Sequence, residues 1–407
     1  MRSVSATLWV ALLLAAPVTP AGAQAPIPVK LGILADMGGL YSDIGGAGVL
    51  EATRLAVEDF AKRPGADRLK VELLSVDSQN KTDIASGIAR RWFDAEGVDA
   101  VLDLPTSAVA LAVLPIAQEK NKVALVTAAA ASDITGRACT PNSVHWTYDT
   151  WSVSRATAAE VTKGGGKSWF FVTADYAFGH ALERDASAVV VANGGRVIGS
   201  VRHPLENKDF GSFLLQAQAS GADVIGLTNA GNDAINAIKQ ASEFGIGQGG
   251  KQALAGMLLF ITDIHSLGLK VMQNIKFTTA FYWDMDEKTK SFGERFAQRY
   301  KGRYPSMTQA GAYSATLAYL AAVQTVGSPK DGRAVVKAMR DAGPIDDPLF
   351  GPTTVREDGR AVHRMLLVQV KTPEESKKPW DYFKVTATIP GEEAFLPLAR
   401  SECPLAK

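Results

Sequence analysis

Apolar runs alternate with amphipathic stretches along the chain, and this order predicts an α/β fold. In the first third of the chain, short apolar or alternating runs predict strands over 29–34, 69–76, 98–102 and 122–126. Apolar residues at helical spacing predict helices over 47–60 and 82–93, and a break at Pro105 starts a third helix. Strands that alternate with helices in this way build parallel sheets covered on both faces.

The same alternation restarts near residue 168 and predicts a second unit of similar length, after a join near 147–154 and 163–166. Its expected strands lie over 168–173, 196–202, 224–227 and 253–255, and its helices over 179–193, 210–219 and 233–244. A strand over 275–280 and helices over 288–300, 311–325 and 332–341 follow. Strands over 365–370 and 381–386, joined by a polar hairpin, come last, so the chain is expected to cross between the units again.

The N-terminus predicts export. A positive charge at Arg2 precedes a short apolar run over 8–16 and an A-x-A site that ends at Ala23. This is the pattern of a secretory signal peptide over 1–23, and the run is too short to span a bilayer. In an exported protein the two cysteines, Cys139 and Cys403, are expected to form a disulfide that ties the C-terminal tail to the body. Two free buried thiols are the alternative.

Size and charge narrow the class of protein. About 380 residues remain after the signal peptide, which suits two lobes better than one core. The chain is 46% hydrophobic and 21% charged, and its net charge of +1 argues against a nucleic-acid or polybasic membrane partner.

Signals for catalysis and for metals are weak. The five histidines show no metal-ligand spacing, and no nucleophile-elbow motif is present. The glycines over 164–166 precede a strand, whereas a phosphate-binding loop follows one. The acidic cluster over 284–287 lacks the central glycine of a calcium loop. The sequence therefore predicts neither an enzyme nor a bound cofactor.

The stretch 98–136 is the best candidate for an anion site. Two predicted strands end there in loops of serine, threonine and alanine, beside a helix N-terminus. Such loops are expected to leave backbone N–H groups free, and together with the helix they can hold a small anion. The alternative is a plain βαβ unit whose helix has a serine N-cap.

Five segments in register carry a family resemblance. They are IPVKLGILADMGGLYSDIGGAGVLEATRLAVED, ALVTAAAASDITG, FFVTADYAFGHALE, KDFGSFLLQAQASGADVIGL and AGAYSATLAYLAAV. The chain resembles the leucine/isoleucine/valine-binding type of periplasmic binding protein over nearly its whole mature length. That family supplies captured ligand to ABC importers.

The resemblance implies a type I periplasmic binding protein fold. It has two doubly wound parallel-sheet lobes, three hinge crossovers and a ligand enclosed between the lobes. On this basis lobe 1 is expected over 26–147 plus 279–351, lobe 2 over 148–278 plus 352–400, and a tail over 401–407. The expected protein is a periplasmic monomer, and its partners are a small-molecule carboxylate and the permease subunits of an ABC importer.

Matching the motifs also implies the ligand's head-group contacts. Ser107 falls on the family's carboxylate-binding serine, and Ala128 falls on a position that contributes its backbone. Ala130 stands where the family often has threonine, and Leu258 stands where it has the glutamate that pairs with an amino acid's ammonium. A buried ammonium without acceptors costs several kcal/mol. The hypothesis is a carboxylate ligand that has no α-amino group.

Other residues in these segments are candidates for the ligand's body. The aromatic ones, which suit an aromatic or other apolar acid, are Tyr41, Tyr176, Phe178, Tyr282 and Trp283. Asn229 and Asn232 follow a strand end and can bind a hydroxyl or carbonyl group. The alternatives are core packing or hinge support for the rings and helix capping for the asparagines.

Four functions follow, in order of preference. The first is transport of a small organic acid, and the second is transport of an amino acid or amide by the same fold. The third is a ligand-binding module that serves a membrane sensor. An enzyme is the fourth, because no nucleophile, base or metal set is visible in the sequence.

Overall fold

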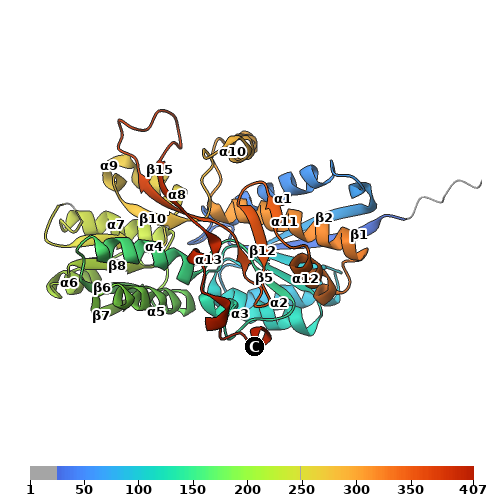
Figure 1. Ribbon diagram of the computed structural model, residues 1–407, viewed down its shortest axis with the longest axis horizontal. Coiled ribbons are helices and arrows are strands. Elements are labelled where there is room, and N and C mark those ends of the chain that lie inside the picture. The colour runs from blue at the N-terminus through green and yellow to red at the C-terminus, as the bar shows by residue number, and fades with distance from the viewer. Residues whose placement is uncertain (1–24, 248) are drawn as a thin grey trace, which may run out of the picture.

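The computed structural model describes residues 25–247 and 249–407, which form two α/β lobes (Figure 1). The first lobe is built on a parallel five-stranded sheet in the order β2-β1-β3-β4-β5. These strands are β1 (Ile27–Ala35), β2 (Leu69–Asp77), β3 (Ala100–Asp103), β4 (Val123–Val126) and β5 (Ser143–His145). The central strands are short apolar runs because helices cover both of their faces.

Helices from two distant parts of the chain cover the first sheet. They are α1 (Gly46–Phe60), α2 (Thr82–Asp94), α3 (Ser107–Glu119), α10 (Glu287–Arg299), α11 (Met307–Val326) and α12 (Gly332–Asp341). α1 packs against α11, and α2 packs against α3. Gly32 lets α2 approach the sheet closely, because a Cβ at Gly32 would lie 2.4 Å from the Trp92 ring.

The second lobe repeats the arrangement with a parallel sheet in the order β7-β6-β8-β9. Its strands are β6 (Ser168–Ala174), β7 (Arg196–His203), β8 (Val224–Thr228) and β9 (Ala253–Gly256). Its helices are α4 (Thr150–Lys163), α5 (Ala177–Ala192), α6 (Gly211–Ala219), α7 (Asn232–Glu243), α8 (Ile261–Leu267) and α9 (Leu269–Met272).

Three connections cross between the lobes, from β5 to α4, from β10 to α10 and from β13 to β14 (Figure 1). Two small antiparallel sheets accompany them, β10-β14-β15 and β11-β12-β13. Their strands are β10 (Lys276–Thr279), β11 (Ile345–Asp347), β12 (Gly351–Val355), β13 (Ala361–Val362), β14 (Met365–Val370) and β15 (Phe383–Ile389). The antiparallel pairing of β14 with β15 confirms the predicted hairpin. The residue boundaries predicted for the lobes stay predictions.

Short helical turns complete the chain. They are α13 (Gly391–Ala394) and the 3₁₀ turns η1 (Ala66–Arg68), η2 (Ser132–Ile134), η3 (Leu398–Arg400) and η4 (Pro404–Ala406). A disulfide joins Cys139 to Cys403, with 5.7 Å between the Cα atoms, and confirms the predicted bridge between body and tail. Across 25–247 and 249–407, no helix combines the length and apolar character needed to cross a membrane. The predicted signal peptide lies outside the described residues.

Several elements near the crossings were not predicted. The segment 147–154, expected to be a join, contains the start of α4, and β5 precedes it. β5 has only three residues, too few to show a periodic pattern. α4 is rich in threonine and serine, which are weak helix formers, but Asp149 caps it by accepting the N–H of Ser152 at 2.7 Å.

Candidate ligand-binding site

A narrow cavity lies between the two lobes. Its lining residues all come from segments that follow the carboxyl ends of parallel strands. From the first lobe and its crossing they are Tyr41, Ile44, Pro105, Ser107, Ala128, Ala129, Ala130 and Tyr148. From the second lobe they are Tyr176, Phe178, Ala230, Leu258 and Phe260.

The strand order explains why the site forms there. The direction of winding reverses between β1 and β3 in the first sheet and between β6 and β8 in the second. Loops diverge at such a switch point and leave a crevice beyond the strand ends. Tyr41 and Ser107 flank the first crevice, and Tyr176 and Ala230 flank the second. The cavity therefore joins two switch points that face each other.

Ser107 is the first residue of α3 and lines the cavity. The residue before it, Thr106, is the N-cap, and its hydroxyl oxygen accepts the N–H of Val109 at 3.1 Å. The alternative of a serine N-cap is therefore wrong. The Ser107 oxygen instead accepts the N–H groups of Ala130 at 3.3 Å and Ala131 at 3.0 Å. Since a hydroxyl has two acceptor sites and one donor, its hydrogen is left to donate.

The loop after β4 is held by an unusual backbone at the end of β3. Asp103 and Leu104 have positive φ angles of 85° and 59°, a costly conformation for residues with side chains. The turn aims the carbonyl of Asp103 at the N–H of Thr127 (3.1 Å), and that of Leu104 at the N–H of Ala129 (3.1 Å). The N–H of Ala128 also donates to the Asp103 carbonyl, at 3.3 Å.

The predicted free N–H groups of this loop are therefore not free. All N–H groups from Thr127 to Ala131 donate within the protein, because the turn at Asp103 and the Ser107 hydroxyl supply acceptors. Unpaired donors remain at the N-terminus of α3, where the first N–H groups of a helix have no intrahelical partner. α5 likewise begins beside the cavity with no side-chain cap. Both helix dipoles favour an anion.

The Asp103 side chain lies behind this loop. It is fully buried, and Thr127 donates to Asp103 Oδ1 at 3.2 Å. Burial raises the pKa of Asp103 from 3.8 to about 7. Asp103 does not line the cavity.

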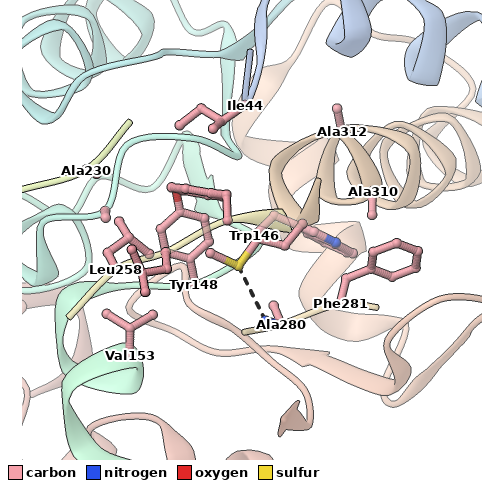
Figure 2. Packing of buried hydrophobic residues seen from close by; sticks show 14 of the residues in the cluster. Ile44, Trp146, Tyr148, Val153, Ala230, Leu258, Ala280, Phe281, Ala310 and Ala312 are labelled. Carbon is pink, nitrogen blue, oxygen red and sulfur yellow. Dashed lines mark hydrogen bonds between the residues drawn. The ribbon is translucent and has the colours of Figure 1, made fainter. Parts of the chain in front are cut away.

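Apolar and aromatic groups form the rest of the wall. Figure 2 shows Ile44, Tyr148, Ala230 and Leu258 gathered between the lobes. Tyr148 packs edge-on against Phe260, with ring centroids 6.0 Å apart, and its hydroxyl donates to the carbonyl of Ala128 at 2.7 Å. The loop after β4 thereby orients the Tyr148 hydroxyl, while the Tyr148 ring faces the cavity.

The lobes touch each other beside the cavity. The hydroxyls of Tyr41 and Tyr176 are 2.6 Å apart, and the N–H of Asn232 donates to the carbonyl of Leu40 at 3.4 Å. Gly231 has a φ of 59°, and a Cβ there would lie 2.7 Å from the Leu40 carbonyl oxygen. Glycine at position 231 thus permits the close approach.

A second contact between the lobes lies outside the cavity. Asp185 of α5 accepts the hydroxyl of Ser132 from the first lobe at 2.7 Å, and that of Thr150 from its own lobe at 2.6 Å. Its neighbour Arg184 pairs with Asp133 at 3.2 Å. The same helix also places Phe178 in the cavity wall, so this contact joins two elements that both reach the ligand site.

Seven of the nine predicted ligand-binding residues line the cavity: Tyr41, Ser107, Ala128, Ala130, Tyr176, Phe178 and Leu258. The other two do not. Asn229 is buried, and its amide nitrogen lies 3.1 Å from His203 Nε2. It does not cap α7 either, because the N-cap of that helix is Gly231. Trp283 donates to the carbonyl of Trp380 at 2.9 Å and stacks near Tyr304.

The positions of Trp283 and Tyr282 follow from the crossing between β10 and α10. Tyr282 donates to Asp381 at 3.1 Å, so both rings pack against the segment before β15 rather than against the cavity. These contacts fit the alternative considered for Tyr282 and Trp283, in which the two rings support the hinge. Asn232, the other asparagine considered, contributes its backbone to the contact between the lobes.

Six residues of the cavity wall were not predicted, and two of them are aromatic, Tyr148 and Phe260. The other four are Ile44, Pro105, Ala129 and Ala230. Tyr148 lies in the crossing from β5 to α4, and Phe260 precedes α8, an element that was not predicted. The segments that carry the resemblance do not include Tyr148, whereas Phe260 ends the segment GMLLF that places Leu258. The available signal was Leu258, a predicted site residue that lies two positions before Phe260 in the run LLF at 258–260.

Within the described part of the chain, the cavity wall contains hydroxyl groups but no charged side chain. Its polar side chains are those of Ser107, Tyr41, Tyr148 and Tyr176. Burial raises the pKa of the Tyr41 and Tyr176 phenols, so both stay neutral. Among residues 25–247 and 249–407, no cluster of three or more His, Cys, Asp or Glu side chains could hold a metal ion.

Comparison with known proteins agrees with this architecture. The sequence model of the family described as periplasmic binding protein matches residues 28–378. A periplasmic binding protein from Burkholderia mallei is 47% identical, with a TM-score of 0.88 over 93% of this chain and 99% of that one. A comparison with curated proteins found no significant match.

Two other solved structures are similar. A branched chain amino acid ABC transporter periplasmic ligand-binding protein from Burkholderia xenovorans is 42% identical, with a TM-score of 0.81 over 93% of this chain and 100% of that one. An ABC transporter solute binding protein from Rhodopseudomonas palustris, in complex with benzoate, is 20% identical, with a TM-score of 0.80 over 93% and 100% of the two chains. At that identity the likeness shows the fold alone.

The matched family, the sheet order and the cavity between two lobes lead to one assignment. Proteins of this family bind solutes for ABC transporters and in general are not enzymes. The family name implies a periplasmic location. The chain belongs to the periplasmic binding protein family and has its type I fold.

Proposed function

We propose that the protein captures a small carboxylate without an α-amino group and delivers it to an ABC importer. The favoured ligand is an aromatic or other apolar organic acid. The protein acts in the periplasm as a monomer without a cofactor, after removal of its signal peptide, and its second partner is the permease of the importer.

The carboxylate end of the ligand belongs at Ser107. The Ser107 hydroxyl accepts two N–H groups, and its hydrogen is therefore directed to another acceptor. The N-terminal N–H groups of α3 lie beside it, and the dipoles of α3 and α5 both add positive potential. A carboxylate matches this set of donors.

The lack of any charged side chain in the cavity wall carries the proposal. An amino acid would bring an ammonium group that needs a carboxylate or several acceptors. Ala130 and Leu258 occupy the two positions where such partners are expected, and neither side chain can accept a hydrogen bond. A buried and unpaired charge costs more than the several kcal/mol of a neutral polar group.

The body of the ligand fits the apolar walls. Rings of Tyr148, Phe178 and Phe260 face the cavity, and aromatic faces and edges suit another ring. The benzoate complex of the Rhodopseudomonas protein shows that this fold can hold such an acid.

The second candidate is an amino acid or amide. It is favoured by the relative from Burkholderia xenovorans, whose description names branched chain amino acids. For this chain, an amino group would require partners among the neutral hydroxyls of Tyr41 and Tyr176. Phenols are weak partners for a buried cation compared with a carboxylate, so we rank this candidate second.

A thermal-shift screen separates the two candidates. Ligand at 100 times its dissociation constant stabilises the native state by about 2.7 kcal/mol. Benzoates, cinnamates and short aliphatic acids are expected to raise Tm, and the corresponding amino acids and amides are not. Stabilisation by amino acids alone would overturn the proposal.

A further inference from the structure

Two open hollows lie next to each other on the surface of the protein, away from the ligand cavity. Their volumes are about 930 Å³ and 1,020 Å³, and they share Trp151, Ala188 and Arg400. We call them together the basic groove. It runs between η2 and the following loop of the first lobe, helices α4 and α5 of the second lobe, and the C-terminal segment that ends in the Cys139–Cys403 bridge.

Positive charge in the basic groove is only partly balanced. Two of its acids are already paired, since Asp133 contacts Arg137 at 2.7 Å and Arg184 at 3.2 Å, and Asp185 contacts Arg184 at 3.1 Å. The remaining cations are Arg155, Lys163 and Arg400, and all three are exposed. Within the described part of the chain, no carboxylate lies within 4.0 Å of any of them. Glu402 is the one unpaired acid in the lining of this groove.

The floor of the groove is apolar but has one unused donor. Its small side chains come from α4 and α5 and include Ala156, Ala159 and Ala188. Trp151 is 9% exposed, and its indole nitrogen has no hydrogen-bond partner among the described residues. Arg400 lies over the indole ring, 5.0 Å from its centroid. An occupant that moves Arg400 off the indole ring could form an ion pair with Arg400 and accept a hydrogen bond from the Trp151 indole N–H.

The groove is built by both lobes. Ser132 and Asp133 of the first lobe and Arg184 and Asp185 of the second line one of its hollows, and these residues make the contact between the lobes outside the cavity. Whatever fills this hollow touches both lobes in the arrangement where they meet.

We propose that the basic groove binds an acidic peptide segment of a protein partner. The cations are spread along two hollows instead of converging on one point, which suits an extended chain with several carboxylates better than a single small anion. The surface is concave, whereas a lipid headgroup layer is flat. The apolar floor and the indole donor add contacts that a peptide backbone and its side chains can use. This proposal does not depend on which ligand the cavity takes.

Fluorescence anisotropy with a labelled octaglutamate peptide tests the proposal on the full mature chain. We expect saturable binding at low ionic strength that weakens as salt rises, since exposed charge pairs are screened. An octalysine peptide is expected not to bind. The triple variant R155E/K163E/R400E is expected to bind octaglutamate at least about tenfold more weakly, because each substitution turns attraction into repulsion.

The matched control is K239E/K270E/K384E, which makes the same change in net charge at exposed lysines outside the groove. It is expected to bind octaglutamate within about twofold of the unmodified protein. The double variant R155E/K163E leaves the Arg400–Trp151 contact intact and covers the case in which the triple variant unfolds. Equal losses in the two triple variants, no saturable binding, or binding to phosphatidylglycerol vesicles without binding to the peptide would each overturn the proposal.

Discussion

The Ser107 hydroxyl oxygen accepts the N–H of Ala131 at 3.0 Å and so joins the start of α3 to the loop that follows β4. The two segments belong to neighbouring strands of one sheet, and the ligand cavity lies against both. The same serine therefore holds the loop over 127–131 in place and keeps its hydroxyl hydrogen available to donate.

Replacing Ser107 with alanine is expected to weaken binding of the acid roughly tenfold to a hundredfold. A hydrogen bond to a charged group contributes about 1.5–3 kcal/mol, and the Ser107→Ala variant loses it. Isothermal titration calorimetry with the best acid from the screen measures the change. A neutral amide of the same acid should lose less, because its oxygen carries no full charge.

Thr106→Ala is the matched control for Ser107→Ala. Thr106 caps the same helix but does not line the cavity. Loss of the cap is expected to lower stability by about 0.5–2 kcal/mol while affinity changes little. If both variants lose affinity equally, the effect comes from disruption of α3, and Ser107 has no direct role.

Leu258→Glu is expected to abolish binding of the acid. Leu258 is 2% exposed in the cavity wall, and a carboxylate there would repel an anionic ligand in a dry site. Combined with Ala130→Thr, it supplies the two acceptors that an ammonium needs, so weak binding of phenylalanine or leucine is expected to appear. Leu258→Met, which keeps the volume, should cost less than about 1.5 kcal/mol. Unchanged acid binding by Leu258→Glu would show that the ligand lies elsewhere.

Asp185→Ala is expected to weaken ligand binding without any change in the cavity wall. Asp185 does not line the cavity, but where the lobes meet it accepts the hydroxyl of Ser132 from the first lobe. Losing this bond removes stability from the arrangement in which the lobes enclose a ligand, and only the enclosed fraction binds tightly. The measurement is calorimetry together with small-angle scattering of the ligand-free protein. A more open average shape and a roughly tenfold loss of affinity are expected from about 1.5 kcal/mol of lost bonding, and unchanged affinity would count against this role.

Asp103 gives the stability of the protein a defined pH dependence. Burial raises its pKa from 3.8 to about 7, so between pH 4 and pH 7 the native state holds a proton that the unfolded state releases. Stability therefore falls as pH rises through this range and is unaffected by this group above it. A rise of about three pKa units corresponds to a loss of roughly 4 kcal/mol in the free energy of unfolding across this pH range. Relative to the Asp103→Asn variant, the unmodified protein should lose stability from pH 4 to pH 7, whereas parallel curves would contradict this assignment.

Much of the fold could be predicted because the central strands are short, continuous apolar runs and the covering helices are amphipathic. The predicted helix over 47–60 is α1 at Gly46–Phe60, and the predicted strand over 168–173 is β6 at Ser168–Ala174. The crossings between the lobes were harder. β5 has only three residues, and α4 is rich in weak helix formers, so tertiary contacts and the Asp149 cap decide their conformation.

The predicted residues of the site all follow strands that the sequence also predicts, but Phe260 was missed although it follows the predicted strand over 253–255. Ser107 and Tyr176 follow predicted strands, so their place at a sheet edge could be inferred. Tyr148 lies in a crossing, where its hydroxyl donates to the carbonyl of Ala128 and its ring packs against Phe260. No periodic pattern signals the positive φ angles of Asp103 and Leu104, although they position the loop over 127–131 that lines the cavity.

Calorimetry with matched ligand pairs tests the central claim most directly. In one pair, 3-phenylpropanoate differs from phenylalanine only by the α-amino group, and in the other 4-methylpentanoate differs from leucine in the same way. Because an unpaired buried ammonium costs at least several kcal/mol, the acid of at least one pair should bind more than about a hundredfold tighter than its amino acid. Micromolar binding of leucine or phenylalanine, with no response to either acid or to benzoates and cinnamates, would contradict the account.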